Sequence, residues 1–217
     1  MPKMPRSEWY DLTRDMNWDL SYISEDAAFP QELSNSFDVP AHDWWAWDEP
    51  YKITYSEYVH NQAGKDAGVY SVNNVLNRSS IMENLDPGWK AAVIAHYGAI
   101  AVAEYQAGIG EARMGRFGRA ASWRNMATFG TLDETRHGQL QTYFPYQALA
   151  KEPRLDWAHK AYHTNEWGVI AARHLFDDMF LANDAVSMAI QLTFTFETGF
   201  TNLQFLGMAA DAMKVGD

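Results

Sequence analysis

The 217-residue sequence contains no cysteine. A disulfide framework, a thiolate zinc site and cysteine catalysis are therefore excluded, and any bound metal must take oxygen and nitrogen ligands. Positive charge is scarce, since 17 Lys and Arg stand against 28 Asp and Glu for a net charge of −11. Nucleic acid and anionic membrane surfaces, which attract basic proteins, are therefore not expected as partners.

Long hydrophobic runs are absent as well. No stretch reaches the length of a membrane span, and residues 1–7 lack the apolar core of a secretion signal. We therefore expect a cytoplasmic protein. What the chain does have is 47% apolar and 14% aromatic residues, which is typical of a globular domain. Its many Trp, Phe and Met side chains favour a large core or interface, with an apolar pocket as the alternative.

The first quarter of the chain differs from the rest. Residues 1–53 contain Pro30, Pro40 and Pro50 and a tryptophan cluster at 44–47, so we predict an irregular N-terminal arm anchored by its aromatic side chains. From residue 54 to residue 217, apolar residues return at helical spacing and no strand-type alternation competes with them. The sequence therefore predicts a single all-α domain with short loops, as in a helix bundle.

Start and stop signals divide this part into helices. Asp86 and Pro87 form the strongest start, an N-cap residue followed by proline at the first helical position. Gly64 and Gly68 weaken the first helix, and Pro145 is expected to kink the third. Five helices are predicted, at 53–77, 86–116, 122–143, 155–183 and 184–213, with stops near Gly118 and Gly216.

The sharpest local motif is Glu134 followed three residues later by His137. This spacing places both side chains on one helix face, close enough to share a metal ion. Short motifs of this kind also occur by chance. The alternative is a surface ion pair with Arg136 nearby.

Two further carboxylates strengthen the metal hypothesis. Glu104 and Glu197 lie among apolar, small and hydroxyl residues of two other predicted helices, where an uncompensated charge is costly. Di-iron bundles take a single Glu from each of two helices and a Glu-x-x-His pair from each of two others. Three carboxylates and an imidazole therefore predict a site for two metal ions. Burial of each Glu against Arg, Tyr or Trp donors is the alternative.

The segment around Glu197 is a poor helix former. Gly199 and several β-branched threonines lower its helix propensity, so we predict a π-bulge, a feature common at functional sites. Thr201 lies one turn beyond Glu197, with Phe205 a further turn on. In the alternative, the Thr201 hydroxyl bonds back to a carbonyl of its own helix.

Several stretches, in order along nearly the whole chain, carry a family resemblance: 48–52, 65–72, 86–89, 96–102, 124–130, 133–140, 161–167 and 196–211. In them the sequence resembles the hydroxylase α subunits of bacterial multicomponent toluene monooxygenases. These belong to the soluble di-iron monooxygenase family, which includes methane and phenol hydroxylases. Alkene and isoprene monooxygenases share much of the same pattern.

The resemblance implies roles for individual residues. Glu104, Glu134 and His137 would hold one iron, with Glu134 bridging to a second iron served by Glu197. Thr201 matches the active-site threonine associated with oxygen activation and proton delivery. Asp133 matches a second-shell carboxylate and Asn202 a polar residue beside the site. The positions that match an apolar substrate pocket are Ile100, Ala103, Ala107, Gln141, Phe176, Leu192, Phe196 and Phe205.

The resemblance also implies an activity, the O2-dependent hydroxylation of small aromatic hydrocarbons such as toluene or benzene, with alkene epoxidation as the alternative. NADH would supply electrons through a separate reductase and a ferredoxin. Hydroxylase β and γ subunits and an effector protein would be the other partners. A non-catalytic metal-binding bundle, or a bundle without metal, are the rivals from other classes.

One expected motif is missing. The family has a second Asp-Glu-x-x-His motif that no segment after Glu197 supplies. We therefore expect the N-terminal portion of a ferritin-like bundle resembling ribonucleotide reductase, truncated before that helix. The 217 residues by themselves are expected to be inactive.

Overall fold

The computed structural model describes residues 8, 23–28, 53–118, 121–156 and 158–216. Most of the predicted arm, with its tryptophan cluster, lies outside these residues. Within it, α2 (Glu25–Ala28) is described, and Ala28 is buried in the hydrophobic core. The division into an arm and a bundle therefore stays a prediction.

All regular secondary structure in the described residues is helical, which confirms the all-α prediction. The elements from Tyr55 onward are α4 (Tyr55–Arg78), α5 (Ile81–Asn84), α6 (Pro87–Phe117), α7 (Ala121–Leu149), η1 (Pro153–Leu155), η2 (Ala158–His163), α8 (Trp167–Leu181), α9 (Ala185–Ala189), the π-helix η3 (Ile190–Thr201) and α10 (Asn202–Val215). None of the described helices is long and apolar enough to cross a membrane.

The two strongest helix starts arise from local capping. Thr54 and Glu57 form a capping box at α4, in which each side chain accepts a hydrogen bond from the other residue's backbone N–H. Asp86 caps α6 by accepting a hydrogen bond from Trp89 N at 2.9 Å. The helix α4 runs without interruption through Gly64 and Gly68, which the sequence marked as weak points.

Two predicted boundaries are wrong. Pro145 does not end α7, which continues to Leu149 with Pro145 buried inside it. The helix predicted from residue 155 begins only at Trp167, after the short turns η1 and η2. The apolar spacing predicted a helix here, but tertiary contacts favour turns. Tyr162 is buried, and Arg173 Nη1 donates to its carbonyl at 2.7 Å.

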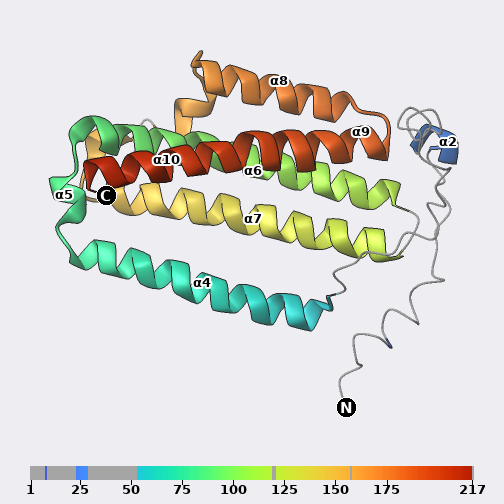
Figure 1. Ribbon diagram of the computed structural model, residues 1–217, viewed down its shortest axis with the longest axis horizontal. Helices are drawn as coiled ribbons and strands as arrows, with labels where there is room; N and C mark the ends of the chain where they lie inside the picture. The colour runs from blue at the N-terminus through green and yellow to red at the C-terminus, as the bar shows by residue number, and fades with distance from the viewer. Residues whose placement is uncertain (1–7, 9–22, 29–52, 119–120, 157, 217) are drawn as a thin grey trace.

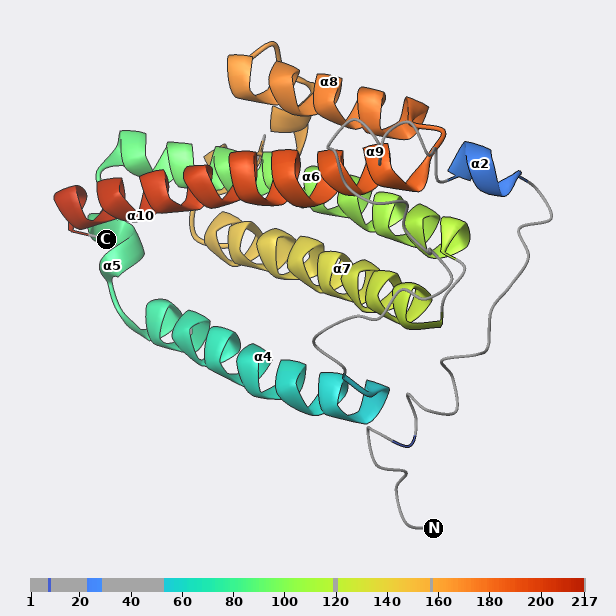
Figure 2. The same cartoon turned by 45° about the vertical axis from the view of Figure 1, so that its right-hand side comes forward.

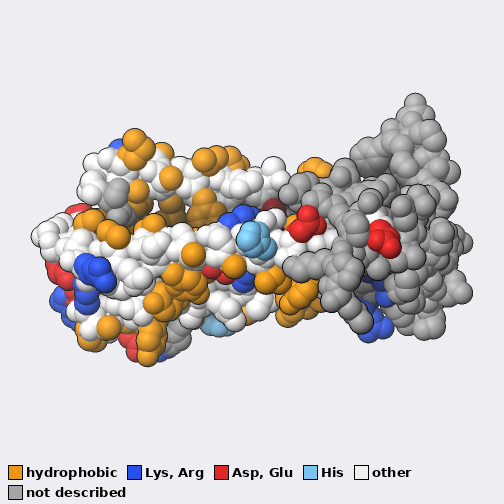
Figure 3. All heavy atoms as spheres, turned by 90° about the horizontal axis from the view of Figure 1, so that it is seen from below, with side chains coloured by type: hydrophobic (Ala, Val, Ile, Leu, Met, Phe, Trp, Pro, Cys, Tyr) orange, Lys and Arg blue, Asp and Glu red, His pale blue; other side chains and the backbone are white. Residues whose placement is uncertain are grey.

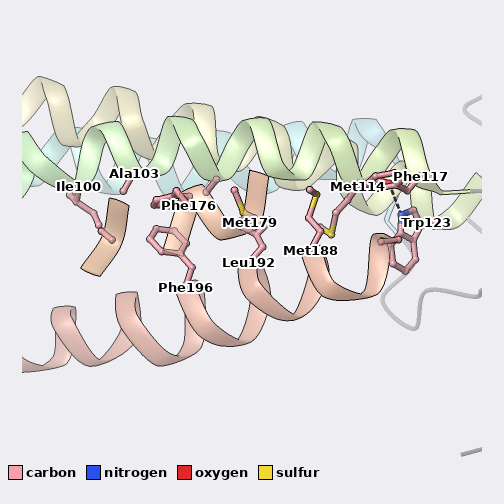
Figure 4. Packing of buried hydrophobic residues seen from close by; sticks show 14 of the residues in the cluster. Ile100, Ala103, Met114, Phe117, Trp123, Phe176, Met179, Met188, Leu192 and Phe196 are labelled. Atoms are coloured by element: carbon pink, nitrogen blue, oxygen red, sulfur yellow. Dashed lines mark hydrogen bonds between the residues drawn. The ribbon is translucent and has the colours of Figure 1, made fainter. Parts of the chain in front are cut away.

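The long helices pack side by side (Figures 1 and 2). α6 and α7 form the closest pair, α9, η3 and α10 run as one continuous stretch along α6, and α8 and α4 lie on opposite sides of this group. Between α6, α8 and the α9–η3 stretch, the apolar core is filled by side chains that interdigitate from both sides (Figure 4). Its fully buried members include Phe176, Met179, Met188, Leu192 and Phe196.

Candidate metal centre

Close approach of α6 and α7 creates the site. A Cβ added at Gly108 of α6 would lie 3.3 Å from the Cβ of Glu134 on α7. A Cβ added at Gly130 of α7 would lie 2.6–2.9 Å from the carboxyl atoms of Glu111 on α6. Each helix therefore has a glycine where the other places a glutamate, and this reciprocal seam admits acidic side chains into a tight helix pair.

Three predicted ligands meet at this seam. Glu104 of α6 and Glu134 of α7 are buried, at 2% and 6% exposure, and His137 is partly exposed. His137 Nδ1 lies 3.5 Å from Glu134 Oε2 and 3.7 Å from Glu104 Oε2. One ligand atom from each residue lies within 4.8 Å of the other two. Two ligands at about 2.1 Å from one ion are separated by roughly 3–4 Å, so this spacing suits a shared metal.

The charges of these groups depend on one another. Interactions with the Glu104 and Glu134 carboxyl groups raise the pKa of His137 to about 10. Burial raises the pKa of Glu134 to about 9, and neighbouring Glu104 adds to the shift. Burial opposes ionisation of Glu104 too, but His137, Glu134 and Gln141 outweigh it and hold the Glu104 pKa below its ordinary value. Without metal, an ionised Glu104 therefore faces a protonated His137 and a protonated Glu134.

Glu197 approaches from η3. The π-helix confirms the predicted distortion, although it extends over Ile190–Thr201 instead of a single turn. Thr198 Oγ1 donates to the Thr193 carbonyl at 2.9 Å. Burial and the charge of Glu104 raise the pKa of Glu197, and interactions with Glu134 and His137 oppose them. Glu134 thus interacts with both Glu104 and Glu197.

Several polar atoms around the cluster lack protein partners. Within the described part of the chain, no hydrogen bond reaches the buried atoms Glu134 Oε2, Glu197 Oε1 or Thr201 Oγ1. The alternative in which Thr201 bonds back to its own helix is therefore not what the structure contains. Buried polar atoms without partners are costly, and carboxylate and imidazole donors are the types that iron takes. The residues fit a metal centre.

The predicted pocket residues divide into three groups. Ala107, Phe176, Leu192 and Phe196 are packed in the core, each with 0% exposure. Ile100 and Ala103 are also buried, and they line a cavity of about 800 Å³.

Gln141 and Phe205 make specific contacts instead. Gln141 Nε2 donates to Glu104 Oε1 at 2.6 Å, which orients that carboxylate. The Phe205 ring packs edge-on against His96, with ring centroids 5.4 Å apart.

Asp133 and Asn202 lie outside the cluster. Asp133 Oδ1 accepts hydrogen bonds from Tyr58 at 2.9 Å and from Arg136 at 2.8 Å. Arg136 also pairs with Asp66 at 2.8 Å, so these residues fasten α4 to α7 behind the site. Asn202 is exposed at the start of α10.

Sequence reasoning missed Glu111. It lies two helical turns beyond Glu104 on the same face of α6, and this spacing is the signal that identifies it. Burial, together with the charges of Glu197 and Asp133, raises the pKa of Glu111 to about 8. Glu111 therefore adds a protonated carboxyl group to the acidic seam.

The fold and the cluster together define a class of protein, the helix bundles that present carboxylate and histidine side chains from facing helices to a metal. A family model for methane, phenol and alkene hydroxylases matches residues 18–217, so the chain belongs to this family.

Individual relatives support this assignment. The chain is 42% identical over its full length to the oxygenase component α subunit of the alkene monooxygenase system of Xanthobacter autotrophicus strain Py2. It is 27% identical, over 95% of its length, to the oxygenase component of phenol 2-monooxygenase from Pseudomonas sp. strain CF600. It spans 44% and 39% of these two relatives.

A solved structure shows the same fold. The crystal structure of xenon-pressurised phenol hydroxylase from Pseudomonas sp. OX1 superposes with a TM-score of 0.71 at 25% identity. The match covers 98% of this chain and 43% of the phenol hydroxylase chain.

Proposed function

We propose that the chain forms part of the oxygenase α subunit of a multicomponent di-iron monooxygenase, which adds one oxygen atom of O2 to a small hydrocarbon. The observation that carries this proposal is the Glu104, Glu134 and His137 cluster, whose ligand atoms lie within 4.8 Å of one another in a member of the hydroxylase family. An all-α bundle whose buried carboxyl groups serve stability alone would not need this convergence.

The proposed ligand roles follow the contacts. Glu104, Glu134 and His137 would hold one iron and Glu197 would serve a second, with Glu134, which interacts with both Glu104 and Glu197, as the carboxylate available to both. When bound, the iron centre supplies the oxidising chemistry. Gln141 orients Glu104 through its 2.6 Å hydrogen bond. Thr201, which is buried and whose hydroxyl has no partner among the described residues, would hold or pass a proton.

An alkene is the proposed substrate. The relative at 42% identity is named for alkene oxidation and the one at 27% for phenol. This order favours the alternative over the toluene and benzene substrates that the sequence suggested. The cavity that Ile100 and Ala103 line has a mostly apolar wall, which suits either substrate class, and pockets of this kind discriminate only modestly between small apolar molecules. An aromatic substrate is therefore the second candidate.

The partners proposed are those of a multicomponent system. Both relatives are named as oxygenase components, which supports hydroxylase β and γ subunits, an effector protein, a ferredoxin and an NADH-dependent reductase as partners. A cytoplasmic location goes with this assignment.

Iron content tests the ligand assignment. In the complete subunit, Glu134→Ala should abolish iron binding, because it removes the carboxylate between the two other acidic ligands. The matched control is Glu166→Ala, which removes an exposed carboxylate at the start of α8 and should retain iron. Normal iron in the Glu134 variant would refute the assignment. Two irons per unmodified chain support the proposal, one favours a non-catalytic metal-binding bundle, and none favours a bundle without metal.

A further inference from the structure

The π-helix η3 has a burial pattern that an α-helix could not produce. Met188, Leu192 and Phe196 recur every four residues, are fully buried and point into the apolar core (Figure 4). The next buried residue is Thr201, which follows Phe196 by five residues and is 6% exposed. Five α-helical steps would turn Thr201 about 140° away from Phe196. Both side chains face the interior because the turn between them is the wider turn of a π-helix.

Hydrogen bonds mark this wide turn residue by residue. Thr198 Oγ1 donates to the Thr193 carbonyl, five residues back, at 2.9 Å. The hydroxyl of Thr128, in the α-helix α7, donates instead to the carbonyl four residues back, at 2.7 Å. At the end of η3, the Asn202 N–H donates to the Glu197 carbonyl, again five residues back. The π register therefore includes Glu197.

Gly199 lies where the wide turn brings a carbonyl unusually close. A Cβ added at Gly199 would lie 3.2 Å from the Phe194 carbonyl oxygen, five residues back. A Cβ added at Gly207, in the α-helical continuation α10, would have nothing within 4 Å. In an α-helix the carbonyl five residues back lies farther away, deeper in the preceding turn. The crowding at position 199 is therefore specific to the π register.

The π turn also sets the rotation of α10, which follows it. α10 has no buried residue of its own, and two of its side chains contact α6. Gln204 Nε2 lies 2.8 Å from His96 Nδ1, and Phe205 packs edge-on against the same imidazole ring. Closing one π turn to an α turn would rotate these two residues and Thr201 by about 100° relative to Phe196. The register at position 199 thus decides which side chains face α6.

We propose that Gly199 is a positioning residue, which keeps η3 in the π register by leaving room for the Phe194 carbonyl and so turns Glu197 and Thr201 toward the metal centre. The positioning rests on the proposed function, because Glu197 is proposed to serve the second iron and Thr201 to hold or pass a proton. Even a methyl group at position 199 favours the α register, in which these two side chains no longer face the centre together.

Crystal structures of the complete oxygenase component carrying Gly199→Ala test the register directly, in metal-free protein. We expect the π-helix to shorten as the turn at position 199 closes to an α turn. Thr201 should turn away from the interior, and the contact between Gln204 and His96 should be lost. Both changes follow from the rotation of α10 and need no bound metal.

Titration of the metal-free complete subunit with Co²⁺ as a probe ion tests the effect on the metal centre. The ion held by Glu104, Glu134 and His137 should bind to Gly199→Ala as it binds to the unmodified protein, because those ligands lie on α6 and α7. The second ion, which Glu197 would serve, should bind at least about fivefold more weakly. That factor corresponds to the smallest usual cost of overpacking.

Two other alanine variants separate positioning from stability. Gly207→Ala changes an open position of the same helical stretch and should retain both ions. Gly118→Ala crowds Trp123 at the end of α6, so it should destabilise the protein while leaving the affinity for the second ion unchanged. A loss of that affinity in Gly118→Ala equal to the loss in Gly199→Ala would assign the effect to stability and overturn the proposal.

The register and the ligand assignment can fail separately. Metal-free crystals of Gly199→Ala report the register whatever Glu134→Ala shows about iron content. Retention of the full π-helix in Gly199→Ala would overturn the proposal, and so would unchanged Co²⁺ affinities in a variant whose register has changed.

Discussion

Buried carboxyl groups that lie close together cannot all be ionised. In the α6–α7 seam, protonation of some of the side chains reduces the repulsion between them. The pKa of His137 is raised to about 10 and that of Glu134 to about 9, so both hold protons at neutral pH. A metal ion binds the deprotonated forms. It can therefore be regarded as the replacement for two buried protons.

Metal affinity should accordingly depend on pH. Between pH 6 and pH 9, proton competition at His137 and Glu134 weakens as pH rises toward their pKa values, so divalent metal should bind more tightly, by up to about tenfold per pH unit for each proton displaced. Anaerobic titration of metal-free protein with Fe²⁺ at several pH values measures this, and proton release is read from buffers of different ionisation enthalpy. Affinity that stays constant over this range would contradict the protonation states.

Glu111 gives a prediction about stability. Its pKa is raised to about 8 in the folded protein, against about 4.3 in the unfolded chain. The folded state therefore binds the extra proton, and the stabilisation it provides is present at low pH and lost as pH rises from about 4.3 to 8. Glu111→Gln should flatten this fall, which amounts to at most about 1.4 kcal/mol per pH unit.

The measurement is the free energy of unfolding in urea across this pH range. Glutamine has nearly the shape of the protonated side chain over Gly130, so packing is preserved. Glu83→Gln is the control, since Glu83 is an exposed acid and its replacement should leave this pH dependence in place. Glu134, whose pKa is raised to about 9, should leave part of the pH dependence in place, so a slope in Glu111→Gln equal to that of the unmodified protein would contradict the prediction.

Among the helices, the sequence predicted correctly those ends that are set by capping residues near them in the chain. Asp86 and Gly118 bound α6 as the sequence indicates, and Gly216 ends α10 in a left-handed conformation with φ 77°. The π-helix follows from Gly199 and its β-branched neighbours. The start of α8 was missed because the hydrogen bonds of Arg173 to the Tyr162 and Thr164 carbonyls, which favour turns there, join residues by tertiary contact.

The residues of the candidate site likewise fall into those that the sequence predicted and one that it missed. Spacing alone brought Glu134 and His137 together, and the apolar surroundings of Glu104 and Glu197 marked them as buried. Glu111 was missed because its burial depends on Gly130 of the facing helix. A single sequence does not show which residues of two helices lie opposite each other.

Gly118 is tightly packed and Gly64 is open to solvent, so replacing each with alanine should change stability in opposite directions. A Cβ at Gly118 would lie 2.0 Å from the ring of the buried Trp123, whose Nε1 donates to the Met114 carbonyl at 2.8 Å. Gly118→Ala should therefore destabilise the protein by about 1–3 kcal/mol through overpacking. Nothing lies within 4 Å of a Cβ at Gly64 in α4, so Gly64→Ala should stabilise it by about 0.5–1 kcal/mol.

Thermal unfolding followed by circular dichroism measures both changes. Shifts of the melting temperature in opposite directions are expected. If Gly118→Ala were as stable as the unmodified protein, the contact between α6 and Trp123 would be looser than described.

Over the whole molecule, apolar side chains remain on the surface. α10 has no buried residue, and its Leu203, Leu206 and Met213 are 68%, 68% and 83% exposed. Seen from the α4 side, hydrophobic side chains also interrupt the polar surface (Figure 3), and α4 contributes exposed Val72 and Val75. Large exposed apolar areas favour association, and the net charge of −11 opposes it.

We therefore expect the 217 residues alone to associate at high concentration. Replacing Leu206 and Met213 with lysine should raise the soluble yield while changing stability by at most about 0.5 kcal/mol, since surface substitutions are mild. Leu192→Lys, at a fully buried position, is the contrasting control and should unfold the protein. Size-exclusion chromatography against concentration measures association, and an unaltered profile for the α10 variant would exclude this face as its cause.

The reciprocal seam also has a consequence for the order of folding. Glu104, Glu134 and His137 lie on two consecutive antiparallel helices, so their meeting requires closure of only a short loop. Glu197 arrives from a helix much later in the chain. Low contact order favours rapid formation, and the α6–α7 hairpin is therefore expected to assemble first. Three of the four proposed ligands would then be in place as a nucleus for metal uptake before the rest of the bundle closes over them.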